Sequence, residues 1–105
     1  MSNQNEFKIT KQSTPQGVRF EAAGFINMET SLELEKELEA ALAAGEKEII
    51  LDMSNTKALT SFGIRVILKT YKTSVAKGGT FQIQSPSSVV ENVLKISNLE
   101  MLVKK

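Results

Sequence analysis

The sequence predicts a single α/β domain with a mixed, mostly parallel β-sheet, an N-terminal antiparallel hairpin, and helices covering the sheet. The chain has 105 residues, the length of one ordinary domain, so we treat residues 1–105 as a single unit. Apolar residues make up 41% and charged residues 24%, as in a folded globular protein. Short strand-like runs alternate with longer segments of helical period, which favours parallel strands with helical cover.

The first two strands are predicted from the alternation of apolar and polar side chains. Residues 7–9 and 18–22 alternate in this way, which is typical of half-buried strands. The segment between them contains Pro15 and Gly17, which favour a turn over residues 13–17. The two strands are therefore predicted to form the hairpin.

The first helix is predicted over residues 28–44, which are rich in strong helix formers, and Gly45 follows as a stop. Asn27 or Thr30 could cap the start of this helix. Helical spacing places four apolar residues on its inward face: Leu34, Leu38, Ala41 and Leu42.

A buried strand is predicted at residues 48–52, followed by a turn over residues 52–55. The second helix is predicted over residues 61–77 and ends at Gly78-Gly79. Its apolar face is predicted to contain Ile64, Ile67, Leu68, Tyr71 and Val75. Its other side carries a basic stripe of Arg65, Lys69 and Lys72.

The C-terminal third continues the alternation of strands and helices. Residues 80–84 are predicted to form a strand, and residues 101–103 to close the sheet as a last strand. Between them, Ser85-Pro86 opens a third helix with proline at its first position. Its inward face is predicted to contain Val90, Val93 and Leu94. Three methionines are predicted to fill the core: Met28, Met53 and Met101.

The chain contains no cysteine and no histidine. This excludes disulfides, Cys/His metal sites, thiol catalysis, the Ser-His-Asp triad and an imidazole base. Carboxylates, lysines, hydroxyl groups and one tyrosine remain as reactive groups, which disfavours a hydrolase or a redox enzyme. No apolar run reaches the roughly 18 residues that cross a bilayer. The polar N-terminal segment lacks a signal-peptide core, so we predict a cytoplasmic location.

Charge is unevenly distributed, although the net charge is only +1. Residues 1–55 carry five basic and ten acidic residues, whereas residues 56–105 carry eight basic and two acidic residues. Such a dipole can orient a protein partner, or it can reflect two solvated helix faces. The basic stripe could contact nucleic acid, but no aromatic residues are interleaved with it, which favours a solvated face.

The most informative segment runs from Leu51 to Ile64, where a buried strand passes through a polar turn into the second helix. Thr60 and Ser61 place two hydroxyl groups at the start of that helix. A hydroxyl there normally caps backbone N–H groups, and composition favours this structural role. The alternative is that Ser61 is a modification site, because a phosphate there would meet free N–H groups and the positive end of the helix dipole.

This segment resembles the signature of STAS domains, the family of bacterial anti-sigma factor antagonists. In the string IILDMSNTKALTSFGIRVIL, the matching residues are Asp52, Ser54, Thr60-Ser61, Phe62 and Gly63-Ile64. The string AAGFINMETSLELEKEL resembles the segment that leads into the family's first helix. The string AKGGTFQIQSPSSVVENVLKISNLEMLV resembles the family's C-terminal part, so the resemblance covers nearly the whole chain.

The resemblance implies a small non-enzymatic switch that regulates transcription through protein–protein contact. We therefore predict that the protein is not an enzyme and has no catalytic residue, cofactor or metal. Ser61 matches the serine that an anti-sigma factor kinase phosphorylates, and phosphorylation releases that partner. The surrounding contact surface would comprise Asn27, Thr60, Phe62, Gly63 and Arg65. In it, Gly63 would allow close approach to the backbone. The resemblance implies neither a nucleic-acid partner nor membrane insertion, and it leaves open a weak homodimer.

Two other functions are compatible with parts of the sequence. STAS domains also serve as accessory subunits of membrane transporters, including lipid-transport complexes of the ATP-binding-cassette type. Thr60 stands where well-known members carry aspartate, and Phe62 where a small residue is usual, and both fit a module that is not phosphorylated. Asp52 could also suggest the phosphate acceptor of a receiver domain. Only Glu6 and Glu21 could then supply the acidic pair that holds Mg²⁺, so a turn-forming role is preferred for Asp52.

Overall fold

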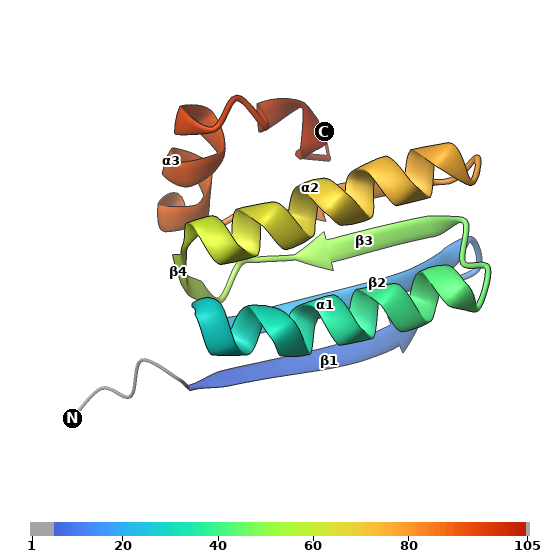
Figure 1. Cartoon of the computed structure of the whole chain (residues 1–105), viewed down its shortest axis with the longest axis horizontal. Coiled ribbons are helices and arrows are strands. Elements are labelled where there is room, and N and C mark those ends of the chain that lie inside the picture. Colours follow the sequence, from blue (N-terminus) through green and yellow to red (C-terminus); the bar gives the residue numbers. More distant parts are fainter. Residues whose placement is uncertain (1–5, 105) are drawn as a thin grey trace.

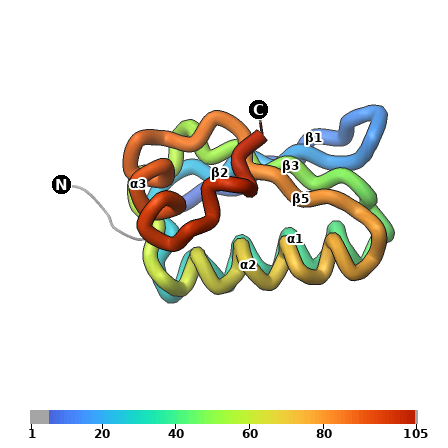
Figure 2. Tube along the Cα trace, turned by 90° about the horizontal axis from the view of Figure 1, so that it is seen from above, coloured from blue at the N-terminus to red at the C-terminus, as the bar shows by residue number. Residues whose placement is uncertain are grey.

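The computed structural model describes residues 6–104, which form a sheet with two helices against one of its faces. Helices α1 (Met28–Ala43) and α2 (Ser61–Ala76) lie side by side on that face, and α3 (Ser88–Ile96) lies at one end of the sheet (Figures 1 and 2). The strands are β1 (Phe7–Ser13), β2 (Gly17–Ile26), β3 (Glu48–Asp52), β4 (Thr56–Leu59) and β5 (Thr80–Gln84). A short 3-10 helix, η1, follows at Glu100–Leu102.

The sheet has the order β1-β2-β3-β5, with β4 also paired to β2. Strands β1 and β2 form the predicted antiparallel hairpin, whereas the pairings of β2 with β3, β3 with β5 and β2 with β4 are parallel. Strand β2 is long enough to pair with β3 through its first half and with β4 at its end. The predicted fold class, an α/β domain with a mixed, mostly parallel sheet, is therefore confirmed.

The core lies between the sheet and the two helices. Strand β2 alternates strictly, and the residues that it buries toward the helices include Val18, Phe20, Ala22 and Ile26. All four residues predicted for the inward face of α1 are buried: Leu34, Leu38, Ala41 and Leu42. The period-2 and helical patterns in the sequence thus identify the same core from both sides.

One strand was not predicted from the sequence, and one predicted strand is wrong. The turn at residues 52–55 leads into an additional strand, β4, in which the hydroxyl of Thr56 donates to the Ala22 carbonyl at 2.7 Å and Leu59 is buried. Residues 101–103 do not form a strand, since the chain turns through η1 and only Val103 makes a bridge, to Ile83. This turn buries the side chains of Leu99 and Leu102, which a straight strand would not bury together.

The third helix begins two residues later than predicted. Pro86 does not occupy the first position of α3, because it lies before the N-cap residue Ser87. Ser85, which was predicted to open the helix, has a positive φ of 50° and is not helical. Ser87 is the N-cap and accepts from the Val90 N–H at 3.4 Å, while its hydroxyl donates to the Thr56 carbonyl at 2.7 Å. The predicted inward face is correct, with Val90 and Leu94 buried and Val93 packed against the core.

The buried face of α2 differs from the predicted one. Ile67 is buried, Ile64, Leu68 and Tyr71 are only half-buried, and Val75 is exposed. The other residues that α2 buries are Gly63, Val66, Thr70 and Ser74. Because α2 packs against both the sheet and α1, its small residues occupy the close contacts. Of the three methionines predicted for the core, Met53 is buried, but Met28 and Met101 are exposed.

Helices α1 and α2 run in the same direction and are joined by an ion-pair cluster. The Lys69 Nζ atom lies 3.0 Å from Glu35 Oε2 and 3.0 Å from Glu39 Oε2. Hydrogen bonds to these two carboxylates raise the pKa of Lys69. The cluster shows which residues of the two helices lie opposite each other.

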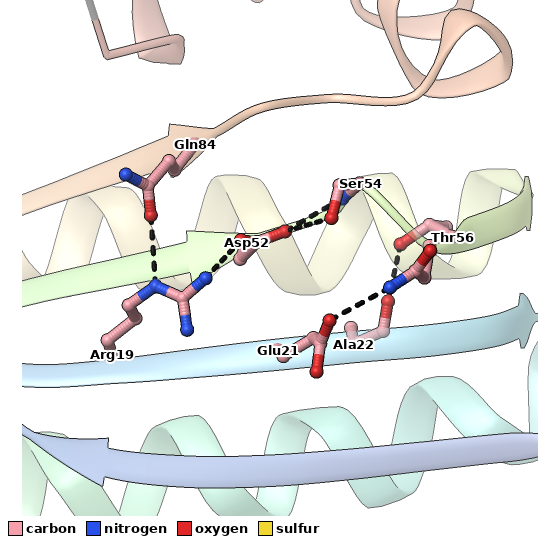
Figure 3. Close-up of polar contacts among 8 residues, drawn as sticks. Arg19, Glu21, Ala22, Asp52, Ser54, Thr56 and Gln84 are labelled. Carbon is pink, nitrogen blue, oxygen red and sulfur yellow. Dashed lines mark hydrogen bonds and ion pairs between the residues drawn. The ribbon is translucent and has the colours of Figure 1, made fainter.

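A polar network on the other face of the sheet holds the turn between β3 and β4 (Figure 3). The buried Asp52 carboxylate pairs with the Arg19 guanidinium and accepts from the Ser54 N–H at 2.8 Å and the Ser54 hydroxyl at 2.7 Å. Arg19 Nε also donates to Gln84 Oε1 at 3.0 Å, which links β2, β3 and β5. Burial raises the pKa of Asp52, but the Ser54 hydrogen bonds and Arg19 together outweigh it, so the pKa lies below its ordinary value.

Gly63 allows the first turn of α2 to pack closely against the sheet. A Cβ atom at this position would lie 2.5 Å from Leu59 Cδ1 and 2.7 Å from Ile26 Cγ2. Ile26 is branched at Cβ and belongs to the core, so it has little freedom to move aside. The missing side chain therefore fixes how closely the start of α2 approaches the ends of β2 and β4.

We predict that Asp52→Asn lowers the free energy of unfolding at pH 7 by roughly 1–3 kcal/mol, because it leaves Arg19 without its counter-charge. Since the folded-state pKa is lowered, the contribution of Asp52 is present above its ordinary pKa of 3.8 and is lost as the pH falls below that value. Urea unfolding at pH 7 and pH 3 should show the two proteins converging in acid. Glu100→Gln is the exposed control, and an equal difference at both pH values would contradict the account.

We predict that Gly63→Ala destabilises the protein by about 1–2 kcal/mol, because the added methyl group overpacks the contact with Ile26 and Leu59. Denaturant unfolding of Gly63→Ala, Leu59→Ala and the double variant measures the effect. The double variant should be more stable than the sum of the single changes predicts, since Leu59→Ala makes room for the new methyl group. Additive effects would show that the methyl group does not meet Leu59.

Candidate functional site

The predicted site residues meet where β2 enters α1 and β4 enters α2. The carbonyl of Ile26, the last residue of β2, accepts from the Thr60 N–H at 3.1 Å and from the Thr60 hydroxyl at 2.9 Å. Asn27 follows Ile26, and Ser61 follows Thr60. These two hydrogen bonds therefore bring the starts of both helices together at one end of the sheet (Figure 1).

Asn27 is the N-cap of α1, and the predicted cap at this position is confirmed. Its Oδ1 accepts from the N–H groups of Glu29 and Thr30 at 3.0 Å each. The Thr30 hydroxyl in turn accepts from the Asn27 N–H at 2.9 Å and donates to the Phe25 carbonyl at 2.6 Å. This capping box gives Asn27 a structural role beside the candidate site.

The start of α2 lacks the cap that the sequence favoured. Thr60 occupies the N-cap position, but its side chain makes no capping hydrogen bond, because its hydroxyl is turned toward Ile26. The first intrahelical acceptor is the Thr60 carbonyl, which binds the Ile64 N–H at 3.0 Å. The N–H groups of Phe62 and Gly63 thus have no side-chain acceptor at this helix start, in contrast to the capped starts of α1 and α3.

Ser61 is the accessible member of the hydroxyl pair. It is the first residue of α2 and is exposed, whereas Thr60 is half-buried. Within residues 6–104, the Ser61 hydroxyl has no hydrogen bond, whereas the Thr60 hydroxyl is engaged. An incoming group can therefore reach Ser61 Oγ without breaking any contact that holds the fold together.

The three neighbouring residues predicted for the contact surface differ in their exposure. Phe62 is 41% exposed and does not enter the core. Arg65, one turn further along α2, is exposed and forms no ion pair with another residue of the described segment. Gly63 is buried, and the close approach that it permits is to Ile26 and Leu59 within the fold. Packing therefore accounts for this glycine without a partner.

Asp52 and the basic stripe are engaged within the protein. The Asp52 carboxylate is buried and bound by Arg19 and Ser54, which supports its predicted turn-forming role. Lys69 is paired with two glutamates of α1, which interrupts the stripe. In residues 6–104 no group of three or more Asp or Glu side chains is placed to hold a metal ion. No helix of this segment is long and apolar enough to cross a membrane.

Sequence analysis missed two exposed apolar residues beside this site. Met28 and Leu32 lie on α1, and each is 57% exposed. Their spacing of four residues places them on one face of the helix. The residues that α1 buries are different ones, namely Thr30, Ser31, Leu34, Leu38, Ala41 and Leu42. The sequence contains this spacing, but it does not show that this face is exposed at the start of α1, directly after Asn27.

Comparison with known sequences gives a match to the family model described as Mlab, STAS domain, over residues 9–104. A protein of Thermotoga neapolitana, named as an anti-sigma factor antagonist, is 38% identical over 63 residues. That match covers 60% of this chain, and the chain spans just over half, 56%, of the relative.

Solved structures share the fold. An anti-sigma factor antagonist structure from Thermotoga maritima superposes with a TM-score of 0.84 at 28% identity, covering 91% of this chain and 83% of that one. The Bacillus anti-sigma factor antagonist SpoIIAA, solved in unphosphorylated and phosphorylated forms, gives TM-scores of 0.80 and 0.75. Its identity is 19% and 18% in the two forms, each covering 94% of this chain and 86% and 89% of the respective SpoIIAA chain, so it supports the fold alone.

The family match covers nearly the whole described segment, including both helix starts at the candidate site. It agrees with the relatives named as anti-sigma factor antagonists, one of which shares the fold at a TM-score of 0.84. These relatives are non-enzymatic regulatory proteins. The chain therefore belongs to the STAS domain family.

Proposed function

We propose that this protein is a cytoplasmic anti-sigma factor antagonist that binds an anti-sigma factor kinase and is released when Ser61 is phosphorylated. The observation that carries the proposal is the start of α2, where an exposed serine hydroxyl without a hydrogen bond in the described segment stands beside an uncapped helix turn. The names of the relatives give the class of partner. Asn27, Thr60, Phe62, Gly63 and Arg65 are proposed to form or support the contact surface.

A phosphate group on Ser61 is compatible with the fold. The group would add about −1.5 to −2 charge units at the positive end of the α2 dipole, near N–H groups that lack a side-chain acceptor. Arg65 lies four residues further along the helix, so its guanidinium is on the same side as Ser61. Phosphorylation is therefore expected to change the surface while leaving the packing intact.

The same phosphate group would weaken a contact formed at this surface. Phe62 follows Ser61 directly and exposes apolar area that a partner would cover. A dianion beside that area must lose its hydration when the partner docks, and the desolvation opposes binding. Phosphorylation can thus release the partner without unfolding any part of the protein.

A second candidate function is an accessory subunit of a membrane transporter of the ATP-binding-cassette type. The exposed Phe62 favours it, because an assembly that stays together needs an apolar anchor and no switch. Thr60, engaged by Ile26, would then serve only to join the two helix starts. The two functions differ in whether a negative charge at Ser61 abolishes binding.

We predict that Ser61→Asp weakens binding to the purified anti-sigma factor kinase of the same organism at least tenfold, whereas Ser61→Ala binds but is not released by ATP. Isothermal titration and mass spectrometry after incubation with ATP measure both effects, and phosphate should appear on Ser61 and not on Thr60. Ser88→Asp is the matched control, because Ser88 is also exposed at the first position of a helix.

Three outcomes would contradict the proposed switch at Ser61, and the last of them would favour the second function. If Ser61→Ala is still phosphorylated and released by ATP, another residue carries the regulatory phosphate. Equal binding of wild type and Ser61→Asp would contradict the switch. Equal binding of a purified transporter ATPase of the same organism to wild type and Ser61→Asp, titrated in the same way, would instead establish the accessory-subunit function.

We predict that phosphoserine installed at position 61 during translation raises the stability of the isolated protein by about 0.5–1 kcal/mol, through the helix dipole and Arg65. Thermal unfolding of the modified and unmodified proteins measures this difference. Arg65→Gln should remove part of the gain, whereas Lys72→Gln, further along the same helix, should retain it. A phosphorylated protein that is less stable than the unmodified one would show that the helix start does not accommodate the phosphate.

A further inference from the structure

Three exposed apolar side chains lie on two different helices at the end of the molecule that carries Ser61. Met28 and Leu32 belong to α1, and Phe62 belongs to α2. Their exposed fractions are 57%, 57% and 41%. We call Met28, Leu32 and Phe62 the apolar patch.

The ion-pair cluster shows that the three residues are neighbours. Lys69 on α2 lies between Glu35 and Glu39 on α1, at 3.0 Å from each. Residues seven positions apart lie about two turns apart on the same side of a helix. Phe62 precedes Lys69 by seven positions, and Met28 and Leu32 precede Glu35 and Glu39 by seven positions. Figure 1 shows that the two helices run in parallel and lie side by side. The register given by the Lys69 ion pairs, carried two turns toward the N-terminus, therefore puts Phe62 opposite Met28 and Leu32.

The charges around the apolar patch describe the surface that it would fit. Glu29 and Glu33 follow Met28 and Leu32 on the exposed side of α1. Arg65 is exposed on the α2 side. A complementary surface therefore has an apolar centre, basic groups facing α1 and an acidic group facing Arg65. An anionic membrane does not fit, because Glu29 and Glu33 would be repelled by it.

We propose that the apolar patch is the anchor of the interface with the anti-sigma factor, and that it receives an apolar side chain from a segment that carries lysine or arginine beside it. This inference rests on the proposed function, and it adds two residues of α1 to a surface that was assigned mainly to α2. Ser61 borders the apolar patch through Phe62, so a phosphate there lies at the edge of the desolvated contact. One added charge at this edge is therefore expected to be sufficient for release.

The test is isothermal titration of the purified anti-sigma factor of the same organism with single variants of the full chain. Leu32→Ala and Met28→Ala are expected to weaken binding at least tenfold. Ile96→Ala and Met101→Ala are the matched controls, because these residues are 73% and 61% exposed but lie outside the apolar patch. They are expected to bind within twofold of wild type. Thermal unfolding should show that all four variants retain the wild-type melting temperature within a few degrees.

Charge reversal tests the chemistry of the partner. Glu29→Lys and Glu33→Lys are expected to weaken binding about tenfold at low salt, and Glu91→Lys on α3 is the control. A photo-crosslinking residue at position 32 should react with the anti-sigma factor, and the same residue at position 96 should not.

Several results would overturn the proposal. If wild-type protein binds and Ser61→Asp does not, but the variants of the apolar patch bind normally, the anchor lies elsewhere and the proposed function remains. If wild type does not bind the anti-sigma factor at all, the proposed function itself fails. Self-association of the wild type in sedimentation, lost in Leu32→Ala, would assign the apolar patch to a second copy of this chain instead.

Discussion

The carbonyl oxygen of Ile26 is the point on which the candidate site depends. It accepts both the backbone N–H and the hydroxyl of Thr60, and it thereby joins the end of β2 to the start of α2. This use of the Thr60 hydroxyl has two consequences. It brings the starts of α1 and α2 together, and it leaves the first turn of α2 without a side-chain cap. The exposed Ser61 hydroxyl stands at that uncapped turn.

The surrounding structure holds this junction in place from both faces of the sheet. On the helix face, the absence of a side chain at Gly63 allows α2 to pack against Ile26 and Leu59. On the opposite face, Arg19 and Asp52 hold the turn from which β4 leads to Thr60 (Figure 3). The site is thus supported by contacts that do not themselves reach the exposed surface. A modification at Ser61 can therefore act on a partner without disturbing the fold.

Most of the fold could be predicted from the sequence, because most helices and strands show a local periodicity of apolar residues. The inward face of α1 and the alternation in β2 are both periodic, and each identifies its buried residues. Strand β4 could not be predicted, because its pairing with β2 joins segments about thirty residues apart and its own four residues have no distinct pattern. The late start of α3 has a similar cause, since Ser87 bonds to Thr56 and becomes the cap in place of Ser85.

The candidate site was only partly predictable for the same reason. The hydroxyl pair at a helix start made Ser61 a candidate, and the resemblance to STAS domains selected it as the modified residue. The capping preference of asparagine predicted the structural role of Asn27, and the resemblance placed it in the contact surface. Neither pattern shows that Thr60 turns its hydroxyl toward Ile26, or that Met28 and Leu32 face Phe62. The Thr60 hydrogen bond depends on the pairing of β2 with β4. The position of Phe62 relative to α1 depends on the register between the two parallel helices, which the Lys69 ion pairs reveal only in three dimensions.

Amide chemical shifts of the ¹⁵N-labelled protein, followed during titration with the anti-sigma factor and again after ATP is added, test the central claim most directly. The account predicts that the first turns of α1 and α2 shift on binding. It predicts further that ATP then produces a phosphoserine signal at Ser61 and returns the amides of Met28 and Leu32 to their free positions. Shifts confined to the open face of the sheet, or a complex that persists after ATP is added, would contradict the account.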